Sequence, residues 1–361
     1  MPGMRPVSDF RREGPAMPAA IDAAAFLQRR DQGVLLLDVR SPAEFEHAHI
    51  PGAFNLPLFD DAQRARVGTV YARKGRADAV ATALALVGGE LEGKLARART
   101  LAEEMTPGSR DILLHCWRGG MRSGAMGWLL EAAGFRVQLL SGGYKAYRRH
   151  VRLGLAQPRR VVVLGGMTGS GKTEILHALS GLGAQVIDLE GLAVHRGSAF
   201  GYMGRQPCNE WFENQLFEQW RTLDPQKPVW LEDESIHIGN VTLCAEFFSH
   251  LSPAPLVRVD VPEESRVERL VRLYADSGME EGIRAALLRL KKRLGLELTQ
   301  RCLESLDAGD YHAVARAVLS YYDRCYRYQL EHREGPVIPL PCQEDDPEKT
   351  ARSLMDMTLF S

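Results

Sequence analysis

One stretch constrains the fold of this chain more than any other: residues 159–173, RRVVVLGGMTGSGKT. Its run of β-branched and leucine residues favours a buried strand. The strand leads into GMTGSGKT (166–173), which satisfies the GxxxxGK[ST] pattern of a phosphate-binding loop, or P-loop. Such a loop joins the carboxyl end of a strand to the start of a helix, so the pattern predicts a parallel α/β sheet around it.

The loop also predicts the ligand's charge. Its glycines permit tight turns, and the backbone amides of residues 169–173 are expected to surround a diphosphate. Lys172 adds a positive charge, and Thr173 is the expected ligand of a Mg²⁺ ion. The motif specifies a phosphate, and neither a nucleotide nor hydrolysis. The predicted diphosphate site consists of Gly166, Gly169, Ser170, Gly171, Lys172 and Thr173.

Acidic residues follow two further strand patterns. The segment PVWLEDE (228–234) ends in Glu232, Asp233 and Glu234, as a metal-binding strand beside a P-loop would. Which of the three faces the metal depends on the pleat of the strand, and the pattern leaves this open. A second segment, 188–201, follows the strand pattern 184–190. It adds four candidate residues at the edge of the sheet where the phosphate is expected to bind, here called the phosphate edge: Asp188, Glu190, His195 and Arg196. The alternative interpretation of this segment is a hydrogen-bonded turn.

Strand and helix patterns alternate along the whole chain, which favours parallel βα units. In the first half, strands are expected at 33–40, 111–116 and 136–140, and helices at 41–45, 122–134 and over most of 60–106. In the second half, strands are expected at 159–166, 184–190, 228–234, 254–261 and 336–341, with a charged helical stretch at 280–306. A chain of 361 residues is long enough for two domains. We predict the class α/β, with a flexible tail at 1–19 and parallel-sheet domains at 20–152 and 153–361, the second ending in a helical, partly basic portion.

A cysteine lies where the first predicted sheet has its carboxyl edge. In LLHCWRGGMRSG (113–124), Cys116 ends a strand and precedes a helix. Backbone amides, the positive end of the helix, and the guanidinium groups of Arg118 and Arg122 should favour the thiolate, so the pKa of Cys116 is expected below its ordinary value of about 8.5. An inert buried cysteine is the alternative, but it does not account for the arginines and glycines of the loop.

Composition excludes several classes of protein. The six cysteines form no CxxC pair and have no histidine neighbours at ligand spacing, which indicates neither zinc nor a disulfide framework. Haem and flavin are likewise not expected. Scattered free cysteines suit a reducing cytoplasm. No apolar run has the length of a membrane span, and the N-terminal residues lack the apolar segment of a signal peptide. The formal net charge of −1 means that any nucleic-acid binding must come from local patches.

The first half resembles the rhodanese family of sulfurtransferases over about residues 20–150. LLDVRSPAEFEHAHIPGAFNLPL (35–58) is similar to the first signature of that family, and VQLLSGGYKAY (137–147) to its closing motif. The resemblance implies that Cys116 carries sulfur as a persulfide. Five residues separate Cys116 from Arg122, one more than in most single-domain rhodaneses. The same spacing occurs in rhodanese-like phosphatases, so a larger anion or selenium could be accommodated.

The two halves together resemble the tRNA 2-selenouridine synthase family, a rhodanese-like domain followed by a P-loop NTPase-like domain. The segments that carry the resemblance are VGTVYARKG (67–75), CWRGGMRS (116–123), GMTGSGKTE (166–174), DLEGLAVHRGSAFG (188–201) and EDESIHIG (232–239). Membership implies replacement of sulfur by selenium at the wobble 2-thiouridine of tRNA. It implies two co-substrates, geranyl diphosphate for S-geranylation and selenophosphate for selenation, and a selenophosphate-producing enzyme as a further partner. Cys116 would either carry selenium as a perselenide or hold the selenophosphate anion.

A tRNA partner requires positive surface, and two segments offer it. YKAYRRHVRLGLAQPRR (144–160) combines basic residues with two tyrosines, which suits phosphate attraction and stacking on an unpaired base. The candidate tRNA contacts in it are Lys145, Arg148, Arg149, Arg159 and Arg160. RLKKR (289–293) is a second cluster, for which a solvated helix face is an equal alternative.

Two rival interpretations stay open. VRVDVPEESRVERLV (257–271) is similar to the strand-to-helix passage of nucleoside monophosphate kinases, which suggests an ATP-dependent small-molecule kinase fused to a sulfurtransferase or phosphatase-like domain. The other rival is a nucleotide-gated binding protein whose first domain only recognises partners. The intact Cys116 loop argues against the second.

Overall fold

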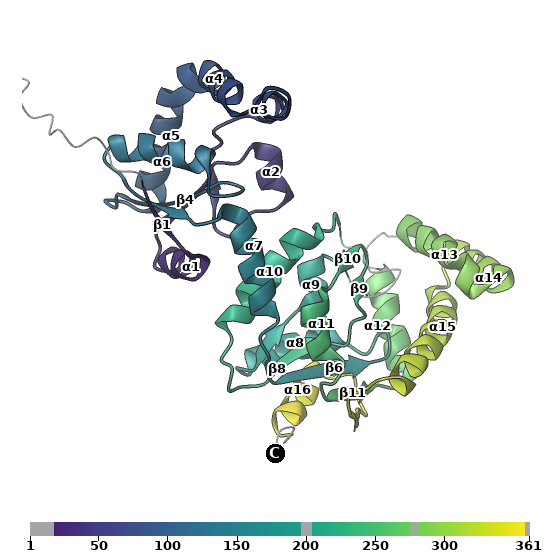
Figure 1. The fold of residues 1–361 in the computed structure, drawn as a ribbon. Helices are drawn as coiled ribbons and strands as arrows, with labels where there is room; N and C mark the ends of the chain where they lie inside the picture. The colour runs from purple at the N-terminus through teal and green to yellow at the C-terminus, as the bar shows by residue number, and fades with distance from the viewer. Residues whose placement is uncertain (1–17, 196–203, 276–279, 358–361) are drawn as a thin grey trace, which may run out of the picture. The chain divides into compact units, whose positions relative to one another are not determined.

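The computed structural model describes residues 18–195, 204–275 and 280–357 (Figure 1). The chain divides into two compact units, and the division falls between Val151 and Arg152. The candidate Arg196 lies outside the described residues.

The first unit is built on a five-stranded parallel sheet with the order β1-β5-β4-β2-β3. Its strands are β1 (Ala19–Ile21), β2 (Leu35–Asp38), β3 (Phe54–Asn55), β4 (Asp111–His115) and β5 (Arg136–Leu140). Its helices are α1 (Ala23–Asp31), α2 (Pro42–His47), α3 (Asp61–Lys74), α4 (Arg76–Val87), the short 3-10 helix η1 (Gly88–Glu90), α5 (Leu91–Met105) and α6 (Met121–Ala132). The central strand β4 is apolar and buried from Ile112 to Leu114, as both faces of a covered parallel sheet require. Helix α7 (Gly143–Leu155) follows β5 and crosses the division.

The second unit has its own five-stranded parallel sheet, in the order β12-β11-β6-β8-β7. Its strands are β6 (Val161–Gly166), β7 (Gln185–Ile187), β8 (Val229–Glu232), β11 (Leu256–Asp260) and β12 (Val337–Pro341), and a two-stranded hairpin adds β9 (His237–Ile238) and β10 (Val241–Thr242). The helices are α8 (Lys172–Gly181), α9 (Leu189–Ala193), α10 (Asn209–Thr222), α11 (Ala245–Leu251), α12 (Glu263–Ala275), α13 (Glu280–Leu294), α14 (Leu296–Asp307), α15 (Tyr311–Glu331) and α16 (Pro347–Met355). The helices α12 to α15 share an apolar cluster of their own, beside the one that covers the sheet.

The predicted α/β class with two parallel sheets is confirmed. Two details differ from expectation. The stretch 280–306 is two helices, because Gly295 adopts φ +87 between α13 and α14, a conformation that glycine tolerates and other residues avoid. The first sheet also takes in Ala19, which we had assigned to the tail. Among the described residues, no helix combines the length and the apolarity needed to cross a bilayer.

Candidate active-site loops

The Cys116 loop lies at the carboxyl edge of the first sheet, between β4 and α6. The Cys116 side chain is 3% exposed, and its Sγ lies 3.2 Å from the Ser123 hydroxyl oxygen. Burial alone would raise the pKa of the thiol. Hydrogen bonds from the Ser123 hydroxyl and from the amides of Ser123, Arg118 and Gly120 outweigh burial and hold the pKa of Cys116 below its ordinary value. The sulfur therefore lies in a cradle of donors that favours an anion.

Two glycines let the Cys116 loop and the turn after β5 pack closely against each other. Gly119 has φ +64, and a Cβ there would lie 2.7 Å from the Leu140 carbonyl oxygen. Gly143 has φ +61, and a Cβ there would lie 2.4 Å from the Cys116 carbonyl oxygen. The turn after β5 also donates a hydrogen bond of 2.8 Å from the Tyr144 amide to that oxygen. The closing motif of the rhodanese signature thus fixes the loop in place.

The two arginines of the loop have different environments. Arg118 is exposed. Arg122 donates to the Glu44 carboxylate of α2 at 2.6 and 3.3 Å, and Arg64 of α3 lies 3.5 Å from the same carboxylate. Burial would raise the pKa of Glu44, but its bond to Arg122 lowers it. We expected both guanidinium charges to act on the sulfur; in this conformation Arg122 is neutralised by Glu44 instead.

A buried polar cluster lies next to the Cys116 loop. Arg40 and Asp38, from the LLDVR segment, form an ion pair of 2.6 Å, and both are at most 1% exposed. The Arg40 guanidinium carbon also lies 3.9 Å from the ring centroid of Tyr144, a cation–π contact. Burial lowers the pKa of His115, which immediately precedes Cys116, so this imidazole is neutral. Our reading of the sequence missed these partners, although Asp38 and Arg40 lie in the first rhodanese signature.

We expect Ser123→Ala to raise the pKa of Cys116, since the variant removes a hydrogen bond that stabilises the thiolate. The profile of Cys116 alkylation by iodoacetamide against pH, followed on the Cys116 peptide by mass spectrometry, should shift to higher pH. Ser353→Ala, at an exposed hydroxyl of α16, is the control and should leave the profile unchanged. An unshifted midpoint in Ser123→Ala would contradict this account of the thiolate.

The P-loop lies at the carboxyl edge of the second sheet, between β6 and α8. Gly169 and Gly171 adopt φ +80 and +76, and Cβ atoms there would meet the backbone of Arg266 and the guanidinium of Arg269. The Lys172 ammonium group donates to the Gly166 carbonyl oxygen at 3.1 Å. The Ser170 hydroxyl is buried and has no hydrogen-bond partner in the described chain. The structure therefore brings the predicted loop residues together.

The three carboxylates that follow β8 point in different directions. Glu232 is fully buried and accepts from the Leu189 amide at 3.0 Å. Asp233 accepts from the Tyr326 hydroxyl and pairs with Arg333 at 3.2 Å. Glu234 lies near Glu190 and Lys172, and burial followed by the charge of Glu190 raises its pKa well above the ordinary value. Asp233 also lies near Lys172, and Glu232 near Glu190, so all three carboxylates lie close to the phosphate edge.

A divalent cation fits this edge. The Thr173 hydroxyl donates to Glu190 at 3.2 Å, which places the expected Mg²⁺ ligand beside two carboxylates, Glu190 and Glu234. Burial also raises the pKa of Glu232, whose Oε1 has no hydrogen-bond partner in the described chain. No three His, Cys, Asp or Glu side chains of the described residues form a ready-made cage. This is compatible with Mg²⁺, which uses one or two carboxylates together with waters and substrate phosphates.

The other phosphate-edge candidates have structural contacts. Asp188 caps α9 by accepting from the Gly191 amide at 2.6 Å. His195 follows Val194, which has φ +52, a strained conformation for a β-branched residue. Burial lowers the pKa of His195, and its Nδ1 has no hydrogen-bond partner in the described chain. The structure thus brings Glu190 to Thr173 and uses Asp188 as a helix cap.

Side chains of helices α12 and α15 make hydrogen bonds to the P-loop backbone. The Gly166 amide donates to the Tyr326 hydroxyl at 2.9 Å. Arg266 donates to the Thr168 carbonyl oxygen at 3.2 Å and binds Asp323 with two hydrogen bonds of 2.9 and 2.8 Å. Burial and the Asp233 charge raise the pKa of Tyr326, so it keeps its proton. The kinase-like segment 257–271 contains Arg266, but no sequence signal indicated Asp323 or Tyr326.

Because the Arg266–Asp323 pair is buried, with exposures of 4% and 8%, removing one partner leaves a buried charge. We expect Asp323→Ala to destabilise the second unit by about 3–5 kcal/mol. Hydrogen exchange of the β6 and β8 amides in increasing urea measures this opening. Glu331→Ala, at an exposed carboxylate of the same helix, is the control. Equal protection in both variants would contradict a structural role for the pair.

The basic segment 144–160 only partly matches the predicted tRNA surface. Lys145 and Arg149 are exposed, and Arg148 is half-buried. Arg159 donates to the Leu223 and Trp220 carbonyl oxygens, and Arg160 to that of Gln226, so these guanidinium groups bind backbone near the end of α10. Both tyrosines of the segment, Tyr144 and Tyr147, are fully buried. The expectation that they stack on a base is therefore wrong for this structure.

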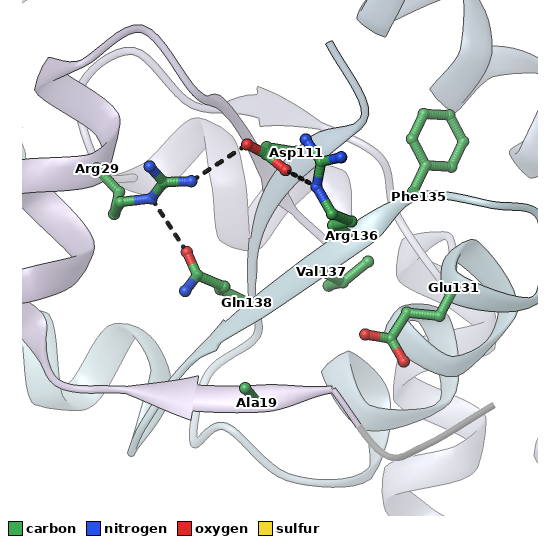
Figure 2. A pocket seen from close by; sticks show the side chains of 8 residues that line it. All are labelled: Ala19, Arg29, Asp111, Glu131, Phe135, Arg136, Val137 and Gln138. Atoms are coloured by element: carbon green, nitrogen blue, oxygen red, sulfur yellow. Dashed lines mark hydrogen bonds and ion pairs between the residues drawn. The ribbon is translucent and has the colours of Figure 1, made fainter.

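A cavity of about 520 Å³ lies elsewhere on the first unit (Figure 2). It is bordered by Asp111 and Arg136, the first residues of β4 and β5, whereas Cys116 follows the last residue of β4. Three of its four charged residues bind one another: Asp111 pairs with Arg29 and with Arg136, as Figure 2 shows. It lies at the opposite edge of the sheet from the Cys116 loop and is not part of that site.

A cysteine in an amide cradle on one parallel sheet, with a P-loop on another, defines an enzyme with two anion-binding loops. Comparisons with known proteins agree. Residues 22–150 match the rhodanese-like domain, and residues 159–354 match the tRNA 2-selenouridine synthase AAA domain.

Three relatives bear the name tRNA 2-selenouridine synthase. The one from Shewanella denitrificans is 34% identical and covers 89% of this chain and 94% of its own length. That from Chromohalobacter salexigens is 37% identical, over 82% of this chain and 88% of its own. That from Aeromonas salmonicida is 37% identical, over 84% and 90%. The chain belongs to the tRNA 2-selenouridine synthase family, which confirms the predicted recognition and the enzyme class, a transferase.

Proposed function

We propose that this enzyme replaces sulfur by selenium in the wobble 2-thiouridine of tRNA, in two steps that use one anion loop each. The observation that carries the proposal is the pair of loops. Each lies at the carboxyl edge of its own parallel sheet, where such sheets place their ligands. Family membership supports the overall reaction. Geranyl diphosphate and selenophosphate are the proposed co-substrates.

The P-loop takes the diphosphate of geranyl diphosphate. The thiocarbonyl sulfur of the uridine attacks C1 of the geranyl group, the C1–O bond breaks, and pyrophosphate leaves with the electron pair. The N3 proton of the uridine passes to solvent. Lys172 and the amides of the loop stabilise the departing charge. Thr173, Glu190 and Glu234 would hold Mg²⁺, which supplies further charge stabilisation when bound.

The Cys116 thiolate has two routes of reaction with selenophosphate, attack on selenium and attack on phosphorus, and they differ in whether an oxidant is needed. Selenium in selenophosphate is at the oxidation level of selenide, so a perselenide on the thiolate forms only if an oxidant removes two electrons. Nothing in the proposed reaction supplies that oxidant. Attack of the thiolate on phosphorus balances without one: an S–P bond forms, the P–Se bond breaks, and hydroselenide leaves with the electron pair. We therefore favour a loop that holds selenophosphate through its phosphate group.

The geometry of the loop supports this route. The amides of Arg118, Gly120 and Ser123 already converge on Sγ, where a phosphate bound to sulfur would receive them. Arg122 lies within the same loop and could exchange Glu44 for the phosphate. Hydroselenide then attacks C2 of the geranylated uridine, the C2–S bond breaks, and geranylthiolate leaves. The selenol proton ends on N3, and water cleaves the S–P bond to restore Cys116.

The Cys116 adduct tests the selenium step. Incubation with selenophosphate should give a phosphorylated Cys116 peptide. Phosphate and selenium adducts have nearly equal mass, so the isotope pattern of selenium must be absent from it. A Cys116 peptide with the selenium pattern would instead show a perselenide and overturn the attack on phosphorus.

The proposed function also implies residues that contact tRNA, an upstream enzyme and a cellular location. Lys145, Arg148 and Arg149 of α7 are proposed tRNA contacts. Arg159 and Arg160 would have to exchange their backbone hydrogen bonds for phosphate to join them. A selenophosphate-producing enzyme is the proposed upstream partner, and a reducing cytoplasm the proposed location.

The binding and reaction of ATP distinguish the proposed function from that of a kinase. If the P-loop serves geranyl diphosphate, that compound should bind more tightly than ATP by isothermal titration, and ATP should be neither hydrolysed nor a phosphoryl donor. Tight ATP binding with phosphoryl transfer to a small molecule would favour the kinase interpretation.

A further inference from the structure

Helix α3 has no fully buried side chain, although it runs from Asp61 to Lys74. Its neighbour α4 leaves Leu84 63% and Val80 38% exposed. The two helices lie side by side in the first unit (Figure 1). Amphipathic helices are ordinarily stabilised by burying one face. This pair therefore presents a surface that the fold itself does not use, and α3 contains the VGTVYARKG segment, which neither active-site loop explains.

The exposed surface of α3 is basic and carries an aromatic side chain. Arg66, Arg73 and Lys74 on α3 and Arg76 at the start of α4 are exposed. None of these four cations has an ion pair or hydrogen bond with another described side chain. Tyr71 is 55% exposed and lies about one helical turn before Lys74, whereas Arg66 and Arg73 lie on the other side of α3. No acidic residue occurs between Asp61 and Asp78. Unpaired cations on the same helix as an exposed aromatic ring match a polyanion that also offers flat bases.

The same helix leads to the Cys116 loop. Near its start, Arg64 shares the Glu44 carboxylate with Arg122, the last residue of the CxxxxxR loop. The Ala43 amide of α2 also donates to Asp61 at 3.0 Å, which fixes the beginning of α3 beside α2. Tyr71 lies about two turns further, or about 10 Å along the helix axis. A chain lying on Tyr71 and Lys74, on the same side of α3 as Arg64, would thus have a neighbouring segment within reach of the loop.

We propose that the exposed surface of α3 and the start of α4 form a docking surface for tRNA, with a base on Tyr71 and phosphates on Lys74 beside it and on Arg66, Arg73 and Arg76 further around the helix. This inference rests on the proposed function. RNA is the partner that this surface suits best, because the surface is cationic and RNA offers both phosphates for the cations and unstacked bases for the exposed ring. The surface also supplies the exposed aromatic group that the segment 144–160 lacks, since Tyr144 and Tyr147 are buried.

Binding of 2-thiouridine tRNA to the full-length protein tests this surface. In a fluorescence anisotropy titration, Arg73→Gln/Lys74→Gln should raise the Kd about tenfold. Its slope of log Kd against log salt should be shallower by about 1.5, since each lost phosphate contact contributes about 0.7–0.9. Tyr71→Ala should also weaken binding about tenfold, whereas Tyr71→Phe keeps the stacking ring and should bind as the unaltered enzyme does. Lys349→Gln/Arg352→Gln removes the same charge from exposed positions of α16 and should change neither quantity.

Alkylation of Cys116 serves as the second measurement, and its rate should be the same in all of these variants. If the unaltered enzyme binds tRNA and Arg73→Gln/Lys74→Gln binds it equally well with the same salt slope, the surface does not dock RNA. A partner such as an acidic protein would give that result. If the unaltered enzyme does not bind or modify tRNA at all, the proposed function fails, and this inference fails with it.

Discussion

Cys116→Ser should stop selenation while S-geranylated tRNA accumulates. A serine hydroxyl at this position is not ionised at neutral pH, so the attack on selenophosphate loses its nucleophile. Loss of a nucleophile typically costs several orders of magnitude, and we expect at least about a 10³-fold fall in selenouridine formation. Geranylation needs only the P-loop and should proceed. Mass spectrometry of nucleosides from tRNA incubated with both co-substrates measures the two products together.

Cys325→Ser is the matched control, because Cys325 is an exposed free cysteine outside both loops. It should form selenouridine at the rate of the unaltered enzyme. Loss of both geranylation and selenation in Cys116→Ser would show that the two loops do not act in separate steps.

Lys172→Ala should give the opposite pattern. The ammonium group is the positive charge of the P-loop, and removing one such electrostatic contact typically costs about 10²–10³ in rate. Geranylation should fall by this amount, and with it selenation of 2-thiouridine tRNA. A tRNA that is already geranylated should still be selenated at the normal rate, because the Cys116 loop is unaltered.

The reaction of Lys172→Ala with tRNA that is already geranylated is therefore the experiment that separates the two steps. Lys349→Ala, at an exposed lysine of α16, controls for a general effect of charge and should leave both steps intact. If Lys172→Ala selenates geranylated tRNA as slowly as it geranylates 2-thiouridine tRNA, the proposed division between the loops is wrong.

Local patterns predicted the elements and both loops. The strands β4 and β6 and the glycines that follow them lie next to one another in the sequence, so each strand, turn and helix could be inferred together. The amide cradle around Cys116 was also predictable, because a strand followed by a glycine-containing turn and a helix turns its amides inward. The break of α13 and α14 at Gly295 was visible as a glycine, but its φ of +87 was not.

Contacts between distant residues were beyond the sequence. Arg122 was expected over the sulfur, yet it binds Glu44, a residue from another βα unit. The contacts of Asp233 depend on Tyr326 and Arg333, which lie far along the chain. Tyr144 and Tyr147 appeared suited to stacking because they lie among basic residues, and the expectation did not take account of which helix face is buried.

The order of the two steps tests the central claim most directly. The unaltered enzyme and 2-thiouridine tRNA are incubated with geranyl diphosphate alone, with selenophosphate alone, and with both, and the nucleosides are analysed by mass spectrometry. We predict S-geranyl-2-thiouridine in the first reaction, unchanged 2-thiouridine in the second and 2-selenouridine in the third. Formation of 2-selenouridine from selenophosphate alone would contradict a mechanism in which the P-loop prepares the sulfur that the Cys116 loop replaces.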